Sequence, residues 1–307
     1  MKKTKLPGFR IYRYEPLPET FKRVILEQLN HSLSLSAGFS ETPDFTTHEI
    51  RKSTKRARAV CKLFRQTTND ELYQSVNNFF GNLSQLLAEH RGSRALMDTL
   101  QLLKKEKKTQ VISGFIGELN VSLEDRHKNL TKKLFNDEHT DALLAELLTE
   151  EIKSIAEAPF FSCDFQQVAS GLRKTYGRCR SLLKVAIEMP TTENLHNLRK
   201  TVKALWNQYI LLRPVWPSYI GAEIHQLDLL AQKLGQEHDL AELERFIREN
   251  EIGSEGKQLK ILLESITWKR LQQQKTSKSL AARLFADKPT DLGRKIGIYY
   301  GLFINKM

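Results

Sequence analysis

The stretch FTTHEIRKSTKRARAVCKLFRQ, residues 45–66, combines the apolar spacing of a packed helix with an unusual density of positive charge. Seven Lys or Arg and one Glu lie within the eighteen residues from His48 to Arg65. At 100° per residue, apolar side chains gather on one side of the helix and cations on the other. The apolar positions are Ile50, Ala57, Cys61 and Phe64, and the cationic positions are Arg51, Lys52, Lys55 and Lys62. Because neighbouring like charges repel, this face indicates an anionic partner.

The same pattern recurs in HNLRKTVKALWNQYILLR, residues 196–213. His48, Arg51, Lys52, Lys55, Leu63 and Arg65 correspond in register to His196, Arg199, Lys200, Lys203, Leu211 and Arg213. No acidic residue lies between His196 and Arg213, and the opposite face is apolar. Two helices with matched basic faces predict one cationic channel, because faces that meet across a cavity concentrate the electrostatic potential.

A third basic segment is GLRKTYGRCRSLLKVA, residues 171–186, with five cations and no acid. Its residues Arg173, Arg180 and Lys184 are spaced i, i+7 and i+11, which places them on one side of a helix. A single basic helix is most often a solvated surface. Three acid-poor helices, two of them in register, instead favour a common anionic ligand.

Apolar periods of three and four residues dominate from residue 19 onward, and period-two alternation is scarce. The 15 Gly and 9 Pro lie mainly between the periodic segments. The sequence therefore predicts an all-α fold. The expected helices are 19–36, 44–66, 69–90, 93–109, 110–129, 138–156, 164–187, 192–213, 216–234, 238–249, 255–273 and 275–285, with helix starts at Pro43-Asp44 and Thr191-Thr192.

The similarity between the halves extends beyond one motif, because residues 86–100 align with residues 229–243 when one residue is added to the second half. A duplicated helical bundle with a pseudo-twofold axis explains this most simply, and two copies are too few for an open solenoid. We expect an N-terminal leader over 1–16, a first bundle over 17–160 and a second bundle over 161–307, with a basic groove between the bundles.

The whole chain is basic, since 48 Lys and Arg against 36 Asp and Glu give a net charge of +12 over 307 residues. Nucleic acid, a membrane surface and a phosphate polymer are the partners that such charge attracts. The three Cys residues lack metal-ligand spacing and indicate no disulfide framework. The basic start lacks a signal-peptide core and no apolar run approaches eighteen residues, so we expect a cytoplasmic protein without a membrane anchor.

The chemistry of the basic faces favours a bare phosphate chain. Duplex readers add base-edge contacts and single-strand binders interleave aromatic rings with cations. Here Phe64, Tyr209 and Phe246 fall on apolar faces, and only Tyr176 and Trp206 lie near the edge of a basic one. An RNA-binding protein that uses the same groove remains the main alternative.

Histidines and acidic residues give little support to a metal site or to catalysis. His48 and His196 lead the two basic faces, where they suit hydrogen bonding to phosphate better than metal binding. The chain shows no P-loop, nucleophile elbow or HExxH motif, and no paired carboxylates lie near the basic faces. We therefore expect no cofactor, no metal and no enzymatic activity. A phosphohydrolase of polyphosphate or triphosphate remains a lesser alternative.

At these residues the sequence resembles the CHAD family, the conserved-histidine α-helical domain. The resemblance rests on HxxRKxxKRxR from His48, GLRKTYGRCR from Gly171, HNLRKTVKALW from His196, LGQEHDLAEL from Leu234 and RLFADKP at 283–289. It implies two four-helix bundles with a basic surface between them that binds inorganic polyphosphate, and in some members a location at polyphosphate granules. Relatives often carry an upstream CYTH triphosphatase domain, for which the leader is too short and lacks the ExExK motif.

The resemblance also implies a set of phosphate-binding residues. Carried over by position, these are His48, Arg51, Lys52, Lys55, Arg58, Arg94, Arg173, Arg180, His196, Arg199, Lys200, Lys203, Lys233 and His238. Arg94 stands before Ala95 at the place where the family leads us to expect an Arg-Asp pair, so this part of the pattern departs from the family.

Overall fold

The structure, a computed structural model, describes residues 8–137, 139–250 and 256–305, and within them it contains helices and no strand. The predicted all-α class is confirmed. The α-helices are α1 (Leu17–Ser36), α2 (Pro43–Leu63), α3 (Asp70–Leu86), α4 (Ala88–Lys104), α5 (Ser113–Lys132), α6 (Thr140–Glu157), α7 (Phe165–Glu188), α8 (Thr192–Leu212), α9 (Pro217–Glu249), α10 (Lys257–Leu284) and α11 (Pro289–Asn305). Short helical turns are η1 (Arg65–Thr67), η2 (Lys107–Ile112), η3 (Lys133–Asp137) and η4 (Arg213–Val215).

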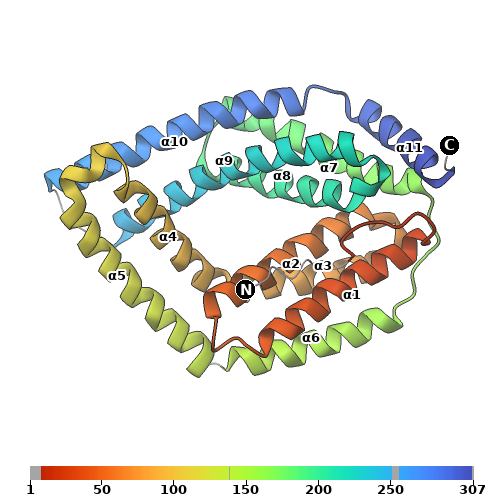
Figure 1. The fold of residues 1–307 in the computed structure, drawn as a ribbon, viewed down its shortest axis with the longest axis horizontal. Coiled ribbons are helices and arrows are strands. Elements are labelled where there is room, and N and C mark those ends of the chain that lie inside the picture. Colours follow the sequence, from red (N-terminus) through yellow and green to blue (C-terminus); the bar gives the residue numbers. More distant parts are fainter. Residues whose placement is uncertain (1–7, 138, 251–255, 306–307) are drawn as a thin grey trace.

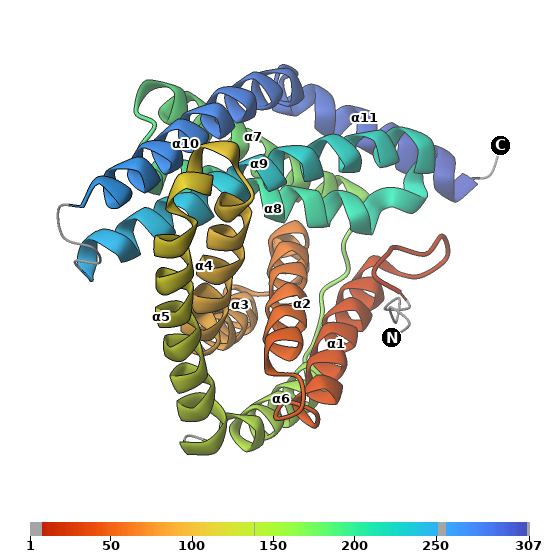
Figure 2. The same cartoon turned by 60° about the vertical axis from the view of Figure 1, so that its left-hand side comes forward.

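The helices form two groups that meet at two places. Helices α1, α2, α3 and α6 lie in the lower part of Figure 1, α4 and α5 rise along its left side to α10, and α7 to α11 lie in the upper part. In the turned view of Figure 2, α2 rises toward α8. Helix α2 packs against α7 and α8, while α4 packs against α9 and η2 against α10. The division of the chain at residue 160 and the pseudo-twofold relation between the groups remain predictions.

Two apolar cores hold the groups together at these contacts. The larger core joins α1 and α2 to α7 and α8, with Phe21, Phe64 and Leu205 among its buried members. The smaller core joins the ends of α4 and α9 to the starts of α5 and α10. Its buried members include Leu103 of α4 and Leu243 of α9. Burial of apolar side chains is therefore what fixes the distance between the groups on both sides.

Local sequence signals explain where several helices begin. Pro43 occupies the first turn of α2, where its missing N–H is not needed. The side chain of Asp164 accepts from the backbone N–H of Gln167 while Gln167 accepts from that of Asp164, a capping box at the start of α7. Thr191 accepts from the backbone N–H of Asn194 at 3.2 Å and caps α8. Both predicted helix starts are confirmed.

The structure corrects the predicted helices in the second half of the chain. Residues 217–249 form one helix, α9, where the sequence predicts two, because Leu234, Glu237 and Leu240 continue a single buried stripe. Residues 257–284 likewise form one helix, α10, and α11 is not predicted at all. The predicted helix starts at 138 and 255, and residues 1–7 of the leader, lie outside the described residues. No described helix is long and apolar enough to cross a bilayer.

Helices α2 and α7 approach each other most closely at Gly171. A Cβ atom placed on Gly171 would overlap the backbone oxygen of Leu63 at the end of α2. Because this neighbour is backbone rather than a flexible side chain, the helices must separate to accept any larger residue. The glycine therefore fixes how closely α7 lies against α2.

We expect Gly171→Ala to lower the free energy of unfolding by about 1–3 kcal/mol, because it overpacks the contact between α2 and α7. Urea denaturation followed by circular dichroism measures this change. Gly221→Ala in α9 is the matched control, since a Cβ there meets no atom within 4 Å. The control variant should be as stable as the parent or slightly more stable. Equal stability of the two variants would contradict this account of the helix contact.

Candidate functional site

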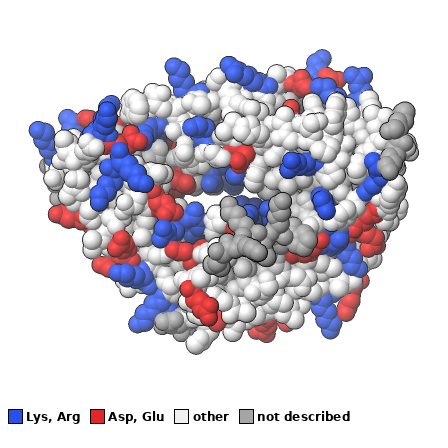
Figure 3. Space-filling view, viewed as in Figure 1, with Lys and Arg blue, Asp and Glu red and all other residues white. Residues whose placement is uncertain are grey.

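A cavity of about 880 Å³ lies between the two apolar cores, and its walls come from both groups of helices. In Figure 3 a hollow near the middle of the face is bordered by Lys and Arg side chains. The lining cations are Arg51, Lys52, Lys55, Arg91, Arg126, Arg199, Lys203 and Arg245, and the lining carboxylates are Glu89, Asp239, Glu242 and Glu249. With eight cations against four acids, the wall carries a net positive charge.

The burial of two apolar faces turns the cations of α2 and α8 toward the cavity. Ile50 of α2 and Val202 of α8 are fully buried, and Leu198 of α8 is 1% exposed. The opposite side of each helix carries the basic residues. The cavity is accordingly lined by four of the predicted residues of α2 and two of α8, namely His48, Arg51, Lys52, Lys55, Arg199 and Lys203.

Three of these cations form no close ion pair with a carboxylate among the described residues: Arg51, Lys55 and Arg199. The carboxylate of Asp239, which also lines the cavity, interacts with Arg199 and Lys55 only from a greater distance. Arg51 donates to the backbone oxygen of Ser84, and the Nε atoms of Arg51 and Arg199 are buried without a hydrogen-bond partner. Burial lowers the pKa of Arg51 and of Arg199, and the charge of Arg91 lowers both further, whereas the charge of Asp239 opposes the shift at Arg199. The centre of the cavity therefore holds positive charge that the protein itself compensates only in part.

Lys55 shows the effect of this charge most clearly. Its side chain keeps contact with water in the cavity, but the surrounding protein prevents full hydration. This desolvation, followed by the charges of Arg199, Arg51 and other nearby cations, lowers the pKa of Lys55 to about 7. An anion beside Lys55 would stabilise its charged form and raise the pKa again.

Cations at the margin of the cavity do have partners. The Nζ atom of Lys203 lies 3.6 Å from Asp228 and 4.2 Å from the centre of the Trp206 ring. Arg126 of α5 lies 3.2 Å from Glu89 and 5.2 Å from the centre of the Phe246 ring. Other pairs are Lys52 with Glu49 at 3.0 Å and Arg245 with Glu242. The compensated charges thus surround the uncompensated ones.

The structure brings two histidines of the second half, His196 and His238, together. The rings of His196 and His238 lie 4.3 Å apart between their centres, and only His238 lines the cavity. Burial and then the charges of Arg199 and His196 lower the pKa of His238 to about 3, so the ring is neutral at pH 7. Burial also lowers the pKa of His48, although its side chain remains 55% exposed.

Seven of the predicted residues do not line the cavity, namely Arg58, Arg94, Arg173, Arg180, His196, Lys200 and Lys233. Arg58 lies 3.3 Å from the side-chain oxygen of Asn77. Arg180 donates to the backbone oxygen of Asp287 at 2.6 Å, next to the start of α11. Arg173 lines a second, smaller cavity between α7 and α11. The basic face of α7 therefore points toward α11, because its other side is buried against α2 and α8.

Three cavity cations are absent from the sequence-based set: Arg91, Arg126 and Arg245. Each has acidic residues nearby in sequence, so a search for acid-free basic faces does not find it. Arg91 lies within the segment that aligns with residues 229–243, and that alignment is the one sequence signal pointing to it.

The comparisons with known proteins fit this arrangement. A family model described as the CHAD domain matches residues 23–248. The chain belongs to the CHAD family. The crystal structure of the CHAD domain from the plant Ricinus communis is similar to this CHAD domain with a TM-score of 0.61, over 92% of this chain and 96% of that chain. Its sequence identity of 15% shows a common fold alone. No curated protein matches the sequence significantly.

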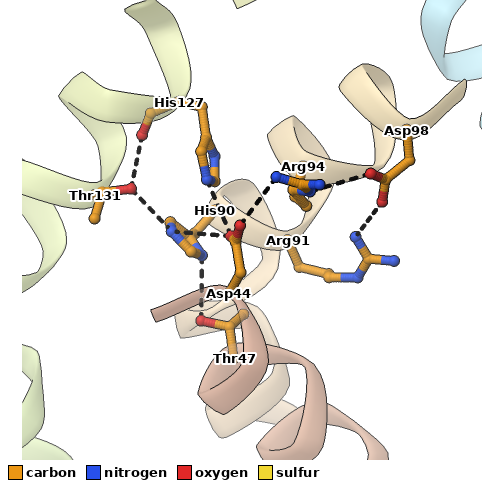
Figure 4. A network of polar contacts seen from close by, with 8 residues as sticks. All are labelled: Asp44, Thr47, His90, Arg91, Arg94, Asp98, His127 and Thr131. Atoms are coloured by element: carbon orange, nitrogen blue, oxygen red, sulfur yellow. Dashed lines mark hydrogen bonds and ion pairs between the residues drawn. The ribbon is translucent and has the colours of Figure 1, made fainter. Parts of the chain in front are cut away.

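Beside the cavity, this CHAD domain contains a polar network that joins the start of α2 to α4 and α5 (Figure 4). Arg94 bridges Asp44, at 3.3 Å, and Asp98, at 3.1 Å. Arg91, which lines the cavity, lies 3.8 Å from the other oxygen of Asp98. The carboxylate of Asp44 also faces two imidazoles, and these three side chains are the one group of described residues with ligand atoms close enough to hold a metal ion.

We expect Lys55→Gln to raise the free energy of unfolding, because the substitution removes one of several cations that repel each other. In the parent protein, the pKa of Lys55 is about 7 when folded and about 10.4 when unfolded. Between these values the unfolded chain binds more protons, so this residue's contribution to stability rises with pH. The advantage of the variant should therefore be larger at pH 6 than at pH 9.

Urea denaturation of both proteins at the two pH values measures this difference. Lys153→Gln, a change at an exposed lysine of α6 outside the cavity, serves as the control and should show no such pH dependence. A stability difference between parent and Lys55→Gln that is the same at pH 6 and pH 9 would contradict the lowered pKa.

Proposed function

We propose that the chain binds inorganic polyphosphate in the cavity between α2, α4, α8 and α9. The observation that carries the proposal is the group of three cations, Arg51, Lys55 and Arg199, that form no close ion pair with a carboxylate among the described residues. The CHAD resemblance supports the same ligand. The Arg guanidinium groups offer paired donors to phosphate oxygens, and the Lys residues offer compact charges.

A flexible chain of phosphates suits this site for a physical reason. Each uncompensated cation costs folding free energy, because it is kept from full hydration and repels its neighbours. A polyanion offsets both costs at several positions at once and releases its own counterions into solution. We therefore expect affinity to fall steeply with increasing salt. The remaining predicted cations, including Arg58 and Lys200, would extend the path of a longer chain outside the cavity.

RNA fits the cavity less well than a bare phosphate chain. Trp206 and Phe246 line the cavity, although the sequence predicts Phe246 on an apolar face. Lys203 lies over the Trp206 ring and Arg126 over the Phe246 ring, so one face of each ring already has a cation where a base would stack. We infer that bases contribute little and that phosphates carry the interaction.

The proposed role is binding without catalysis. Among the lining acids, Glu89 pairs with Arg126 and Glu242 pairs with Arg245, so neither is free to act on a bound phosphate. Burial raises the pKa of Asp239 despite the nearby charge of Arg199. A cytoplasmic location and association with polyphosphate granules belong to the same proposal.

The double variant Arg51→Glu with Arg199→Glu should lose polyphosphate affinity by roughly a hundredfold or more at physiological salt, because it reverses two of the three unpaired charges. Isothermal titration calorimetry with polyphosphate of defined length measures the affinity. The dependence of the logarithm of affinity on the logarithm of salt concentration should also become shallower.

The matched control is Lys153→Glu with Lys174→Glu, which changes the net charge equally at two exposed lysines outside the cavity. This variant should bind within about threefold of the parent, since only screened, long-range attraction is lost. If the cavity variant binds as well as the control, the polyphosphate site lies elsewhere.

Two further measurements separate the alternatives. Unstructured RNA should displace labelled polyphosphate only weakly, and equal competition at equal phosphate concentration would favour an RNA-binding function. Incubation of the protein with polyphosphate or triphosphate and Mg²⁺ should release no orthophosphate. Release that is lost in the cavity variant would instead identify a phosphohydrolase.

A further inference from the structure

Three side chains from three helices converge beside the cavity: Asp44 of α2, His90 of α4 and His127 of α5 (Figure 4). The Oδ1 atom of Asp44 lies 3.0 Å from Nε2 of His127 and 3.8 Å from Nε2 of His90. All three ligand atoms lie within 4.8 Å of one another. His90 is 2% exposed and the His127 side chain 11%, so the cluster faces the protein interior more than solvent.

The contacts within the cluster leave the carboxylate oxygen without a hydrogen bond. Oδ1 of Asp44 is buried and has no hydrogen-bond partner, although an imidazole nitrogen lies 3.0 Å away. The distance permits a hydrogen bond, so its orientation is what prevents one. Oδ1 of Asp44 therefore keeps an acceptor position that no donor occupies, beside two imidazoles.

We propose that Asp44, His90 and His127 bind a divalent transition-metal ion, with Zn²⁺ as the best match. Two imidazoles and one carboxylate are a common donor set for Zn²⁺, which takes a water as its fourth ligand. Zn–N and Zn–O distances near 2.0–2.2 Å place tetrahedral ligand atoms about 3.3 Å apart. The cluster reaches that spacing if its side chains move by about 1 Å.

Neighbouring hydroxyl groups contact both ring nitrogens of His90, and a metal ion on Nε2 would replace the hydrogen bond from Nε2 to Thr131 while Thr47 keeps the ring oriented. Thr131 donates its hydroxyl proton to the backbone oxygen of His127, so it accepts from Nε2–H of His90 at 3.1 Å. The Nδ1 atom of His90 lies 3.2 Å from the hydroxyl of Thr47. On metal binding the ring changes tautomer: Nε2 gives its lone pair to the ion and Nδ1–H donates to Thr47, with no net gain or loss of protons. This is the usual support for a metal-bound histidine.

The charges around the cluster set its affinity. Two carboxylates, Asp44 and Asp98, face the positive charges of Arg91 and Arg94. Nη1 of Arg94 lies 3.3 Å from Oδ2 of Asp44. Arg94 keeps a second carboxylate partner in Asp98, so a metal on Asp44 does not leave it unpaired. The nearby cations repel the ion, and we therefore expect micromolar rather than nanomolar affinity.

The test is calorimetric titration of Zn²⁺ into the full chain after treatment with a chelator, in a buffer without phosphate. The parent should bind one equivalent of Zn²⁺, and Asp44→Asn or His127→Gln should each weaken binding at least tenfold. His225→Gln removes an exposed histidine of α9 and should leave binding within about twofold. Circular dichroism shows whether each variant remains folded. If either Asp44→Asn or His127→Gln does not fold, the other variant provides the test.

Co²⁺ in place of Zn²⁺ adds a spectroscopic measurement. The parent should show the visible absorption of a tetrahedral Co²⁺ site, and His127→Gln should lose it while His225→Gln keeps it. Absence of stoichiometric binding, or binding that persists unchanged in both Asp44→Asn and His127→Gln, overturns the proposal. The polyphosphate experiment does not depend on these results, because its variants are outside the cluster.

Discussion

The packing of α2 against α7 and α8 is the constraint from which the candidate site follows. These helices bury their apolar faces in one core, so Arg51 and Lys55 of α2 and Arg199 and Lys203 of α8 face the cavity. Hydrophobic burial is non-directional and large, whereas repulsion between like charges on a helix is small per pair. The apolar contacts therefore determine the fold, and the clustering of Arg51, Lys55 and Arg199 is a consequence that the fold tolerates.

The second apolar core explains why the cavity persists. Without the contact of α4 and η2 with α9 and α10, repulsion across the cavity would push the two groups of helices apart. The smaller core resists this on the side opposite α2 and α8. The cavity therefore lies between two packed regions, and its walls do not depend on a bound ligand for their position. A preformed site of this kind loses little conformational entropy on binding.

Much of the fold could be predicted from periodicity, because α1, α2, α7 and α8 begin or end within a few residues of the expected positions. Residues 217–249 and 257–284 were harder to predict as single helices. Local signals such as Gly235 favour a break, but buried side chains on one stripe keep the helix continuous. The register of the two basic faces pairs Arg51 with Arg199 and Lys55 with Lys203, and these four residues line the cavity. His196 and Lys200, the counterparts of His48 and Lys52, do not line it. The choice of residues that contact a ligand remains a prediction.

Other parts of the site could not be found from sequence, for reasons of geometry. Arg126 reaches the cavity from α5 only because the smaller core places that helix beside α9. Asp44, His90 and His127 are far apart in sequence and follow no metal-ligand spacing, so the sequence indicates no metal there. A charge pattern also does not show which element the basic side of α7 faces, because α11 packs there and the sequence does not predict α11.

The unpaired cations of the cavity also couple the folded state to the ionic medium. Any small multivalent anion that enters the cavity binds the folded chain and not the unfolded one, so it shifts the folding equilibrium by mass action. Cellular orthophosphate and phosphorylated metabolites would then act as stabilisers of this protein even when no polymer is present. We expect the free energy of unfolding of the domain to be lowest in a dilute medium whose only anion is chloride.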